Sequence, residues 1–475
     1  MFLYVPKLLC GRSIMMQPDG TQDTNSEQNP FSVLAIQDRA GRTSAAPTSG
    51  TRWTVLLALC LLSGILYLDR ICISAALPSI KEELKLDNTQ VSYILNAFVL
   101  AYGLFEVPTG RWGDRLGARR VLTRISLWWS AFTAMTGACT SLVPMMIVRF
   151  LFGAGEAGAF PNSAKVISRW FPERERGRAQ GIHLGASQIG GAIAPFLATV
   201  LITLVGWRLT FVIFGCVGVV WAWGFHRWFR DAPSEHPDVS PSEAAYIAAG
   251  TTHGTVHEPV PWRLVAKSRS VWWLSVIMIC ASFNAYIYFS WFTPYLIFAR
   301  GIPAVQAGAM SSFVLAGAAV GTLCGGLIVD VLAAGSTTRR RLIGCLSFII
   351  AAVCLGLSLA SDSASLAVLF ASMSCFATQA TQPLWWTSCI NISGPHVGSL
   401  TGLMNSAGVF GAMASQSLVG MLTDHYKTLG FSGRTQWDPI FYVDIFVLLA
   451  AAVLWATFSQ RAVEDHVTKP MSSRA

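Results

Sequence analysis

Residues 148–161 read VRFLFGAGEAGAFP, an apolar, glycine-rich stretch that carries one arginine and one glutamate. Arg149 and Glu156 are seven residues apart, which places them on one face of a helix, roughly 10 Å apart along its axis. Gly153 lies between them on that face and leaves space beside the helix. If this helix crosses a membrane, both charges are costly there and must face a partner or a cavity. The character of the surrounding chain therefore decides how this stretch is interpreted.

The composition of the chain is typical of a membrane protein with many spans. Hydrophobic residues make up 53% of its 475 residues and charged residues 12%, whereas soluble proteins contain roughly 25% charged residues. The net charge of +9 comes from basic clusters in short loops, so it indicates topology and not a nucleic-acid-binding face. The sequence has no CxxC or histidine-rich pattern and no enzyme signature, so we expect no metal site, no cofactor and no enzymatic activity.

Apolar runs of about 20 residues recur from Thr54 onward, and each is long enough to cross a bilayer. Six runs are followed by a polar, proline-rich linker and then by six more. The predicted spans cover residues 54–78, 90–110, 119–140, 143–166, 178–204, 208–228, 271–299, 305–331, 341–360, 364–390, 398–423 and 440–459. We therefore expect an all-α membrane protein with two six-helix bundles, the span count of transporters whose halves are related by an axis along the membrane normal.

These runs also set the expected domains. They are a disordered tail at 1–50, an N-terminal bundle at 51–228, a linker at 229–270, a C-terminal bundle at 271–460 and a second tail at 461–475. The loops after the second, fourth and eighth spans are rich in arginine, whereas the odd-numbered loops carry almost no Lys or Arg. By the positive-inside rule, both termini and the linker are predicted to be cytoplasmic, in a multi-pass protein of the plasma membrane.

The loop after the second span carries the string GRWGDRLGARR at residues 110–120. This string resembles the loop signature of the major facilitator superfamily, and with the twelve spans and the linker the resemblance covers residues 54 to about 460. It implies a gating loop in which tight glycine turns let an aspartate and several arginines pair across helix ends. The residues of the predicted gating loop are Gly110, Arg111, Gly113, Asp114, Arg115, Gly117, Arg119 and Arg120.

Further strings resemble one branch of that superfamily, the anion:cation symporters, which include bacterial carriers for galactonate, hexuronates and glucarate. They are YLDR at 67–70, RFLFGAGEAGAFP at 149–161, WFPERERGRA at 170–179 and LMNSAG at 403–408. The resemblance implies proton-coupled uptake of an organic anion by alternating access between the two halves.

Four charged residues of the first and fourth spans form the predicted site. Arg70 and Arg149 are expected to bind the anion, because a guanidinium stays charged when buried and its fork fits a carboxylate. Asp69 and Glu156 are the predicted proton-coupling residues, because burial and a nearby arginine shift a carboxyl pKa in opposite directions. The resemblance places the family's binding arginines and coupling carboxylates at the same positions. We expect Glu156 to hold its proton while substrate engages Arg149, and to compensate the arginine when the site is empty.

Neutral polar groups complete the predicted site. Tyr67 shares a helix face with Arg70, whereas Asp69 points about 100° away, into the bundle. Positions that line the cavity and contact sugar hydroxyls in relatives are occupied here by Tyr67, Tyr102, Gln188, Trp385 and Asn405. Helix packing is the competing interpretation for each of them. The C-terminal half is expected to supply only neutral polar groups.

The leading functional hypothesis is proton-coupled symport of a sugar acid, either a hexonate, a hexuronate or an aldarate. An aromatic carboxylate is the nearest alternative substrate, because the chain contains 17 tryptophans. A sugar-phosphate/phosphate antiporter is a further alternative, but it would need a basic residue in each half, and the C-terminal spans show none in mid-span. One chain of twelve spans can form a complete pathway, so we expect a functional monomer whose partners are the anion, protons and lipid.

Overall fold

A computed structural model describes residues 49–249, 262–332, 336–393 and 397–459, all within one compact unit. The first half consists of α2 (Thr51–Leu84), α3 (Asn88–Leu116), α4 (Ala118–Thr136), α5 (Leu142–Glu156), α6 (Ala159–Trp170) and α7 (Glu173–Trp228). α5 and α6 form one membrane segment that is interrupted between them. α7 contains two segments joined at Gly206, whose φ of +79° is easily adopted only by glycine.

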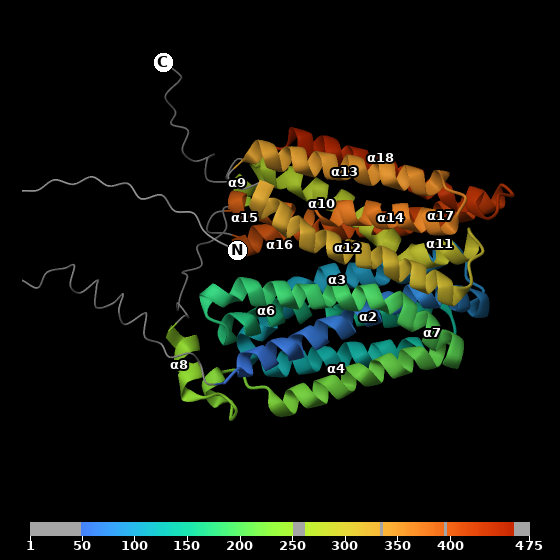
Figure 1. Cartoon of the computed structure of the whole chain (residues 1–475). Helices are drawn as coiled ribbons and strands as arrows, with labels where there is room; N and C mark the ends of the chain where they lie inside the picture. Colours follow the sequence, from blue (N-terminus) through green and yellow to red (C-terminus); the bar gives the residue numbers. More distant parts are fainter. Residues whose placement is uncertain (1–48, 250–261, 333–335, 394–396, 460–475) are drawn as a thin grey trace, which may run out of the picture. The chain divides into compact units, whose positions relative to one another are not determined.

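The second half repeats this plan. Its helices are α10 (Arg269–Tyr286), the π-helix η2 (Ile287–Trp291), α11 (Phe292–Phe298), α12 (Ala304–Leu332), α13 (Thr337–Ala360), α14 (Ala364–Gln379), α15 (Gln382–Ser393), α16 (Val397–Ser406), α17 (Gly408–Thr428) and α18 (Arg434–Thr457). α10, η2 and α11 form one segment, as do α14 with α15 and α16 with α17 (Figure 1). The described ranges thus contain twelve segments in two bundles, which confirms the predicted fold class.

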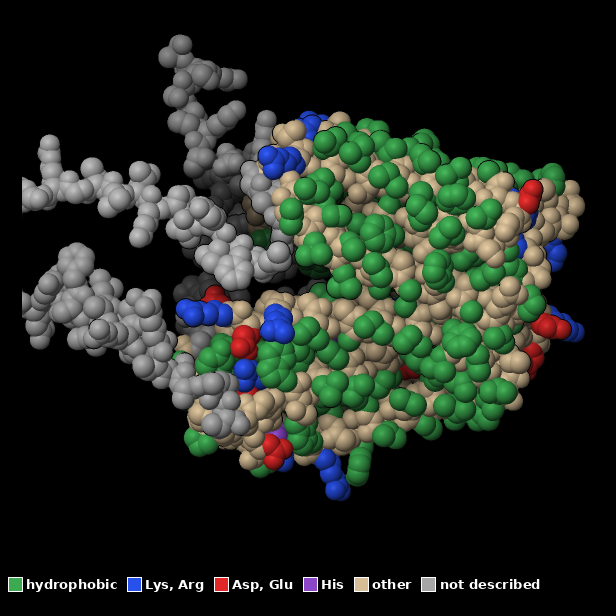
Figure 2. Space-filling view, viewed as in Figure 1, with side chains coloured by type: hydrophobic (Ala, Val, Ile, Leu, Met, Phe, Trp, Pro, Cys, Tyr) green, Lys and Arg blue, Asp and Glu red, His purple; other side chains and the backbone are tan. Residues whose placement is uncertain are grey.

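The outer surface has the character of a lipid-facing one. Large apolar side chains such as Leu204, Val331 and Phe446 are more than 70% exposed, which is unfavourable in water over so wide an area. Figure 2 shows apolar side chains over the middle of the helices and charged side chains gathered toward the two ends. This distribution places the middle of the bundles in the hydrocarbon core of a membrane.

Close packing of α5 against α3 explains the glycines of the fourth segment. A Cβ atom at Gly153 would lie 2.5 Å from the carbonyl oxygen of Phe98, so no larger residue fits without moving α3. The sequence predicted open space beside the helix at Gly153, but the backbone of α3 occupies that space. This close approach holds Arg149 and Glu156 beside α2 and α3.

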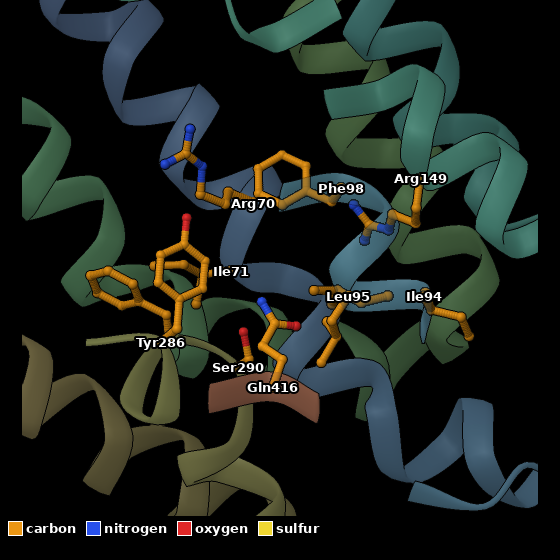
Figure 3. Close-up of a pocket in the computed structure, with 11 residues that line it drawn as sticks. Arg70, Ile71, Ile94, Leu95, Phe98, Arg149, Tyr286, Ser290 and Gln416 are labelled. Atoms are coloured by element: carbon orange, nitrogen blue, oxygen red, sulfur yellow. The ribbon is translucent and has the colours of Figure 1, made fainter. Parts of the chain in front are cut away.

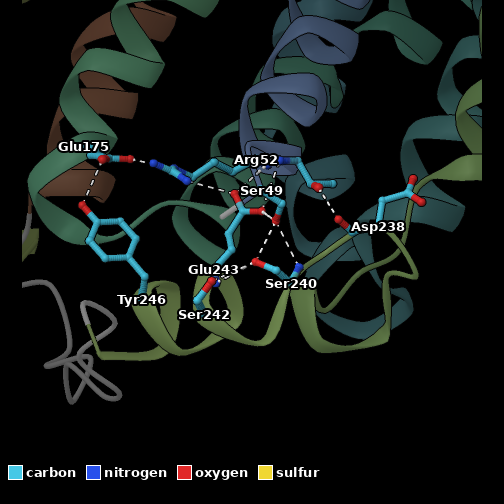
Figure 4. A network of polar contacts seen from close by, with 9 residues as sticks. Ser49, Arg52, Glu175, Asp238, Ser240, Ser242, Glu243 and Tyr246 are labelled. Atoms are coloured by element: carbon cyan, nitrogen blue, oxygen red, sulfur yellow. Dashed lines mark hydrogen bonds and ion pairs between the residues drawn. The ribbon is translucent and has the colours of Figure 1, made fainter. Parts of the chain in front are cut away.

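A polar network fastens the linker to the first half (Figure 4). Glu243 of α8 (Pro241–Ala249) is fully buried and accepts hydrogen bonds from the backbone N–H groups of Thr51 (3.1 Å) and Arg52 (3.2 Å). It also accepts one from Nη1 of Arg52 at 2.9 Å, while Nε of Arg52 donates to Glu175 of α7 at 3.0 Å. Gly50 provides no side-chain cap for α2, so Glu243 supplies one from the linker. We call the end of the molecule that carries this network the linker end.

The hydrogen bonds also determine the charge of Glu243. Burial by itself raises the pKa of this carboxyl, but the donors from Ser49, Arg52 and Thr51 outweigh burial and hold the pKa below its ordinary value. Glu243 is therefore ionised in the folded protein. Its stabilising contribution is complete above the ordinary glutamate value of about pH 4.3 and is lost as the pH falls through the lower folded-state pKa.

Replacing Glu243 with alanine should loosen the linker and the start of α2. We expect a loss of about 2 kcal/mol in the free energy of unfolding, because a helix cap and charge-assisted hydrogen bonds disappear together. The measurement is the thermal midpoint of the purified protein in detergent at pH 7. Glu235→Ala is the matched control, since Glu235 is an exposed glutamate of the same linker. Equal midpoints for the two variants would show that the network does not stabilise the fold.

Candidate functional site

A small cavity lies between the two halves (Figure 3). Its lining residues are Arg70, Ile71, Ile73, Ile94, Leu95, Phe98 and Arg149 from the first half and Tyr286, Phe289, Ser290 and Gln416 from the second. The volume is about 20 Å³, which is room for about one water molecule. The cavity therefore combines two arginines with a mostly apolar wall, and it is collapsed in this conformation.

Arg70 of α2 is held by a carboxylate and by aromatic rings. Its Nε donates to Oε1 of Glu156 at 2.7 Å, and its Nη2 contacts the same oxygen. The guanidinium carbon lies 4.8 Å from the ring centroid of Tyr102 and 4.9 Å from that of Tyr67, close enough for cation–π attraction. The structure thus brings together three residues of the predicted site, Tyr67, Arg70 and Tyr102, with Glu156 as the counter-ion.

Arg149 of α5 is buried without a counter-ion in contact. Only 2% of its surface is exposed, and its Nε and Nη2 atoms have no hydrogen-bond partner in the described part of the chain. Its guanidinium carbon lies 5.0 Å from the ring centroid of Phe152 and 5.3 Å from that of Phe211. Buried donors without acceptors are costly. Because Arg149 also lines the cavity, these donors are available to an anion that enters it.

Asp69 lies behind the cavity. It is fully buried and faces Trp129 and Thr133 of α4, although neither of its carboxylate oxygens has a hydrogen-bond partner among the described residues. Arg70 on the same turn lines the cavity, so the two neighbours point in different directions, as their helical spacing predicts. Asp69 can therefore influence the site through its charge without contacting a molecule in the cavity.

The pairing of Glu156 differs from the sequence-based expectation. That expectation linked Glu156 to Arg149, two turns away on one helix, whereas the structure pairs Glu156 with Arg70. The reason is that α5 ends at Glu156 and α2 passes beside this end. Helical spacing reveals partners within one helix only, so the contact with another span was not visible in it.

The remaining predicted polar residues lie outside this cavity. Gln188 of α7 and Asn405 of α16 are half-buried. Trp385 of α15 is buried within the second half, and its Nε1 donates to the carbonyl oxygen of Leu274 at 2.9 Å. None of the three belongs to the lining residues, so their contact with a substrate stays a prediction.

Sequence reasoning missed the contribution of the second half. Tyr286, Ser290 and Gln416 line the cavity, and Oε1 of Gln416 is buried without a partner in the described ranges. A buried amide inside an apolar span was the available signal. The lining residues of this half, Tyr286, Phe289, Ser290 and Gln416, are all neutral, as expected. Asp444 of α18 is fully buried in this half but lies outside the lining, and this acid was visible in the span predicted at 440–459.

Comparisons with known proteins agree on one family. Residues 59–416 match the sequence profile of the Major Facilitator Superfamily. The chain is 31% identical over 387 residues to a probable sulfoacetate transporter of Cupriavidus necator, an alignment that covers 79% of this chain and 88% of the relative. It is 30% identical over 379 residues to a probable L-galactonate transporter of Escherichia coli, with coverage of 78% and 83%.

The chain belongs to the major facilitator superfamily. The fold agrees: a bacterial homologue of the human lysosomal transporter Spinster, in an inward-facing and occupied conformation, superposes with a TM-score of 0.71 at 20% identity, covering 87% of this chain and 98% of that one. The chain is therefore a multi-pass membrane transporter and not an enzyme, as the sequence predicted.

The loop that the sequence predicts to gate this transporter is described in part. The side chains of residues 110–115 lie outside the described part of the structure, so the predicted roles of Gly110, Arg111, Gly113, Asp114 and Arg115 stay predictions. Gly117 has a φ of +83°, and the carboxylate of Asp231 accepts a hydrogen bond from the backbone N–H of Arg119 at 2.9 Å. Nε of Arg119 donates to the carbonyl oxygen of His226 at 2.9 Å, and Arg120 is exposed. These contacts join the loop to the end of α7 and to the start of the linker.

The two halves of the transporter are joined at the end opposite the linker. Asp424 of α17 accepts hydrogen bonds from the backbone N–H groups of Asn88 (3.1 Å) and Thr89 (2.7 Å), at the start of α3. It therefore satisfies donors that a helix N-terminus leaves free, and its charge complements the helix dipole. Asn96 of α3 also donates to Ser417 of α17 at 2.7 Å. These bonds require the halves to touch, so the transporter is closed at this end.

Removing Asp424 should open this closed end more often. In Asp424→Ala we expect the amides of Asn88 and Thr89 to exchange hydrogen for deuterium roughly tenfold faster, because their common acceptor is lost. Mass spectrometry of peptides from the start of α3 provides the measurement. Asp362→Ala is the control, since Asp362 is an exposed acid of the second half that pairs with Arg434. Exchange that stays at the wild-type rate in Asp424→Ala would contradict the assigned closure.

Proposed function

We propose that this transporter imports a sugar acid together with protons. The observation that carries the proposal is Arg149, a buried arginine whose unpaired donors face a cavity between the halves, beside the ion pair of Arg70 and Glu156. Fixed positive charge in such a place favours a small anion. The names of the two relatives support an organic anion as the substrate, since sulfoacetate and L-galactonate are both organic anions.

The ion pair suggests how proton and anion binding are linked. While Glu156 is ionised, it occupies the guanidinium of Arg70, and an anion would have to compete with it. A proton on Glu156 removes its charge, and the fork of Arg70 becomes available to the substrate carboxylate. Proton and anion then favour each other's binding, which is the thermodynamic requirement for symport.

Asp69 contributes a second buried carboxyl on the same turn as Arg70. No hydrogen bond to its carboxylate oxygens is formed by the described residues, and its charge is compensated at longer range by Arg149. We assign it to proton coupling with Glu156, as the family resemblance implies. An anion that engages the arginines withdraws this compensation and favours a proton on Asp69 as well.

The second half supplies the groups that would recognise the rest of the substrate. Ser290 and Gln416 reach the cavity from η2 and α17, and hydroxyl and amide groups can both donate to and accept from sugar hydroxyls. A six-carbon acid is far larger than the present cavity of about 20 Å³, so the halves must separate before it binds. We assign the linker end to the cytoplasm by the charge of its loops. The present conformation is then closed toward the outside.

An aromatic carboxylate is the second candidate substrate. Phe98, Tyr286 and Phe289 line the cavity, and a flat aromatic ring would pack well between them. A phosphate antiporter gains no support, because the described lining of the cavity contains no Lys or Arg from the second half.

Transport by purified protein in liposomes tests the proposed function. With an inward proton gradient, we expect the wild type to accumulate a sugar acid and Arg149→Ala to take it up roughly 30-fold more slowly, since a buried charge partner is lost. Glu156→Gln should exchange substrate across the membrane without accumulating it, because its neutral side chain leaves the guanidinium of Arg70 free whether or not a proton is bound.

Two controls separate these effects from general damage. Arg124→Ala removes an exposed arginine of α4, and Glu235→Gln neutralises an exposed linker glutamate. Both should transport like the wild type. The proposed coupling would be contradicted if uptake by the wild type did not depend on the proton gradient. It would also be contradicted if Glu156→Gln accumulated the substrate to the wild-type level.

Gln416 distinguishes the two substrate classes. In Gln416→Leu we expect the KM for a hydroxylated acid to rise roughly tenfold to a hundredfold, because a buried hydrogen-bonding group is replaced by an apolar one. Uptake of an aromatic acid should change little. The measurement is initial uptake of both acids, with Gln306→Leu, an exposed position of α12, as control. An unchanged KM for the hydroxylated acid would remove Gln416 from the site.

A further inference from the structure

A second polar site lies inside the second half, away from both arginines. Asp444 of α18 is fully buried and Asn284 of α10 is 1% exposed. Nδ2 of Asn284 donates to Oδ2 of Asp444 at 2.7 Å. Asp444 is ten residues from the start of α18 at Arg434, or roughly 15 Å along the helix. That distance places the carboxyl near the middle of the membrane.

No residue in the described part of the chain supplies Asp444 with a compensating cation. The titratable groups that face it are Cys280 of α10, Tyr288 of η2 and Cys375 of α14, none of them positively charged. α13 and α17 also pack against α18, but their described charged residues lie near helix ends, at Arg339–Arg341 in α13 and at Asp424–Lys427 in α17. An ionised Asp444 would thus be an isolated charge in mid-membrane, which is costly.

The hydrogen bonding of Asp444 is compatible with a carboxyl that gains and loses a proton. One oxygen accepts the N–H of Asn284, and the other, Oδ1, has no partner in the described ranges. A neutral acid needs one such accepting oxygen and carries its proton on the other. A bound metal ion would instead need several oxygen ligands, and among the described residues only the amide of Asn284 contacts the carboxylate.

We propose that Asp444 is a proton-binding site of the second half, whose occupancy controls the cavity wall formed by residues 286–291. Asn284 lies two residues before Tyr286, and the helix then changes to the π-helical turn η2. Tyr286 and Ser290 line the cavity, while Tyr288 of the same turn faces Asp444. Such π-helical turns are frequent at functional sites. When Asp444 loses its proton, its carboxylate places a negative charge beside this turn. The charge then changes the arrangement of Tyr286 and Ser290, the residues of the turn region that line the cavity.

This inference rests on the proposed proton-coupled transport and adds one proton to it. If Asp444 gains and loses its proton in each cycle, Asp444→Asn transports one proton fewer per anion. With the membrane potential clamped at zero and an inward gradient of one pH unit, its accumulation ratio for the anion is then about tenfold lower than that of the wild type. Asp362→Asn, which neutralises an exposed acid of the same half, should accumulate the anion as the wild type does.

Asn284→Ala provides a second, independent measurement. Its amide N–H stabilises the ionised form of Asp444, so its removal should shift the midpoint of the pH dependence of transport upward by about one pH unit. A purely structural role for Asn284 would lower the stability without moving this midpoint. Infrared spectra of the purified protein complete the test. The wild type should show a protonated carboxyl band that is missing in Asp444→Asn, whether or not that variant transports.

The outcomes separate the two proposals. If the wild type accumulates the anion with the pH gradient and Asp444→Asn reaches the same accumulation ratio, the proton site at Asp444 is overturned. The proposed function then remains intact. If anion accumulation by the wild type does not depend on the pH gradient, the proposed function itself is overturned. Accumulation that follows a sodium gradient in place of protons also overturns the site. If Asp444→Asn does not fold, an unshifted pH midpoint in Asn284→Ala or an absent carboxyl band in the wild type overturns it.

Discussion

The buried ion pair between Arg70 and Glu156 is the constraint on which the rest of the account depends. It joins the first and fourth membrane segments where α5 ends, and both partners are removed from water, with side chains 13% and 0% exposed. Breaking such a pair by removing one charge is costly, because the other charge stays buried. The pair therefore separates readily only when another charge replaces one partner or a proton neutralises Glu156. In the proposed mechanism a substrate carboxylate takes the place of Glu156 once a proton has neutralised it, so this one contact would link anion binding to proton binding.

The two halves contribute different chemistry. The first half holds two arginines and two carboxyls close together, whereas the second half offers hydroxyl and amide groups to the cavity and keeps one acid, Asp444, inside its own bundle. This division suits a substrate with one charged end and one neutral end. The bonds of Asp424 to the start of α3 close the end opposite the linker, while the network around Glu243 holds the linker on the first half. Movement between the halves can then expose the site without disturbing the packing of either bundle.

The sequence predicted the fold and drew attention to charged residues that the structure places at or beside the cavity, because both depend on local signals. Apolar runs of span length specify the helices, and an arginine or acid inside such a run is rare enough to be noticed, as with Asp69, Arg70 and Glu156. The partner of Glu156 could not be predicted, since it depends on how α2 lies against the end of α5. Gln416 and Asp444 were overlooked although each is a polar residue in an apolar span. Which side of its helix each residue faces follows from tertiary packing and not from periodicity.

The most direct test of the central claim is the number of protons taken up when the anion binds to purified protein. Titration calorimetry in buffers with different ionisation enthalpies gives this number for the wild type and for Glu156→Gln. If protonation of Glu156 frees Arg70, the wild type takes up protons as the anion binds, and the variant takes up fewer. Anion binding to the wild type without proton uptake, or equal uptake in both proteins, would contradict the account.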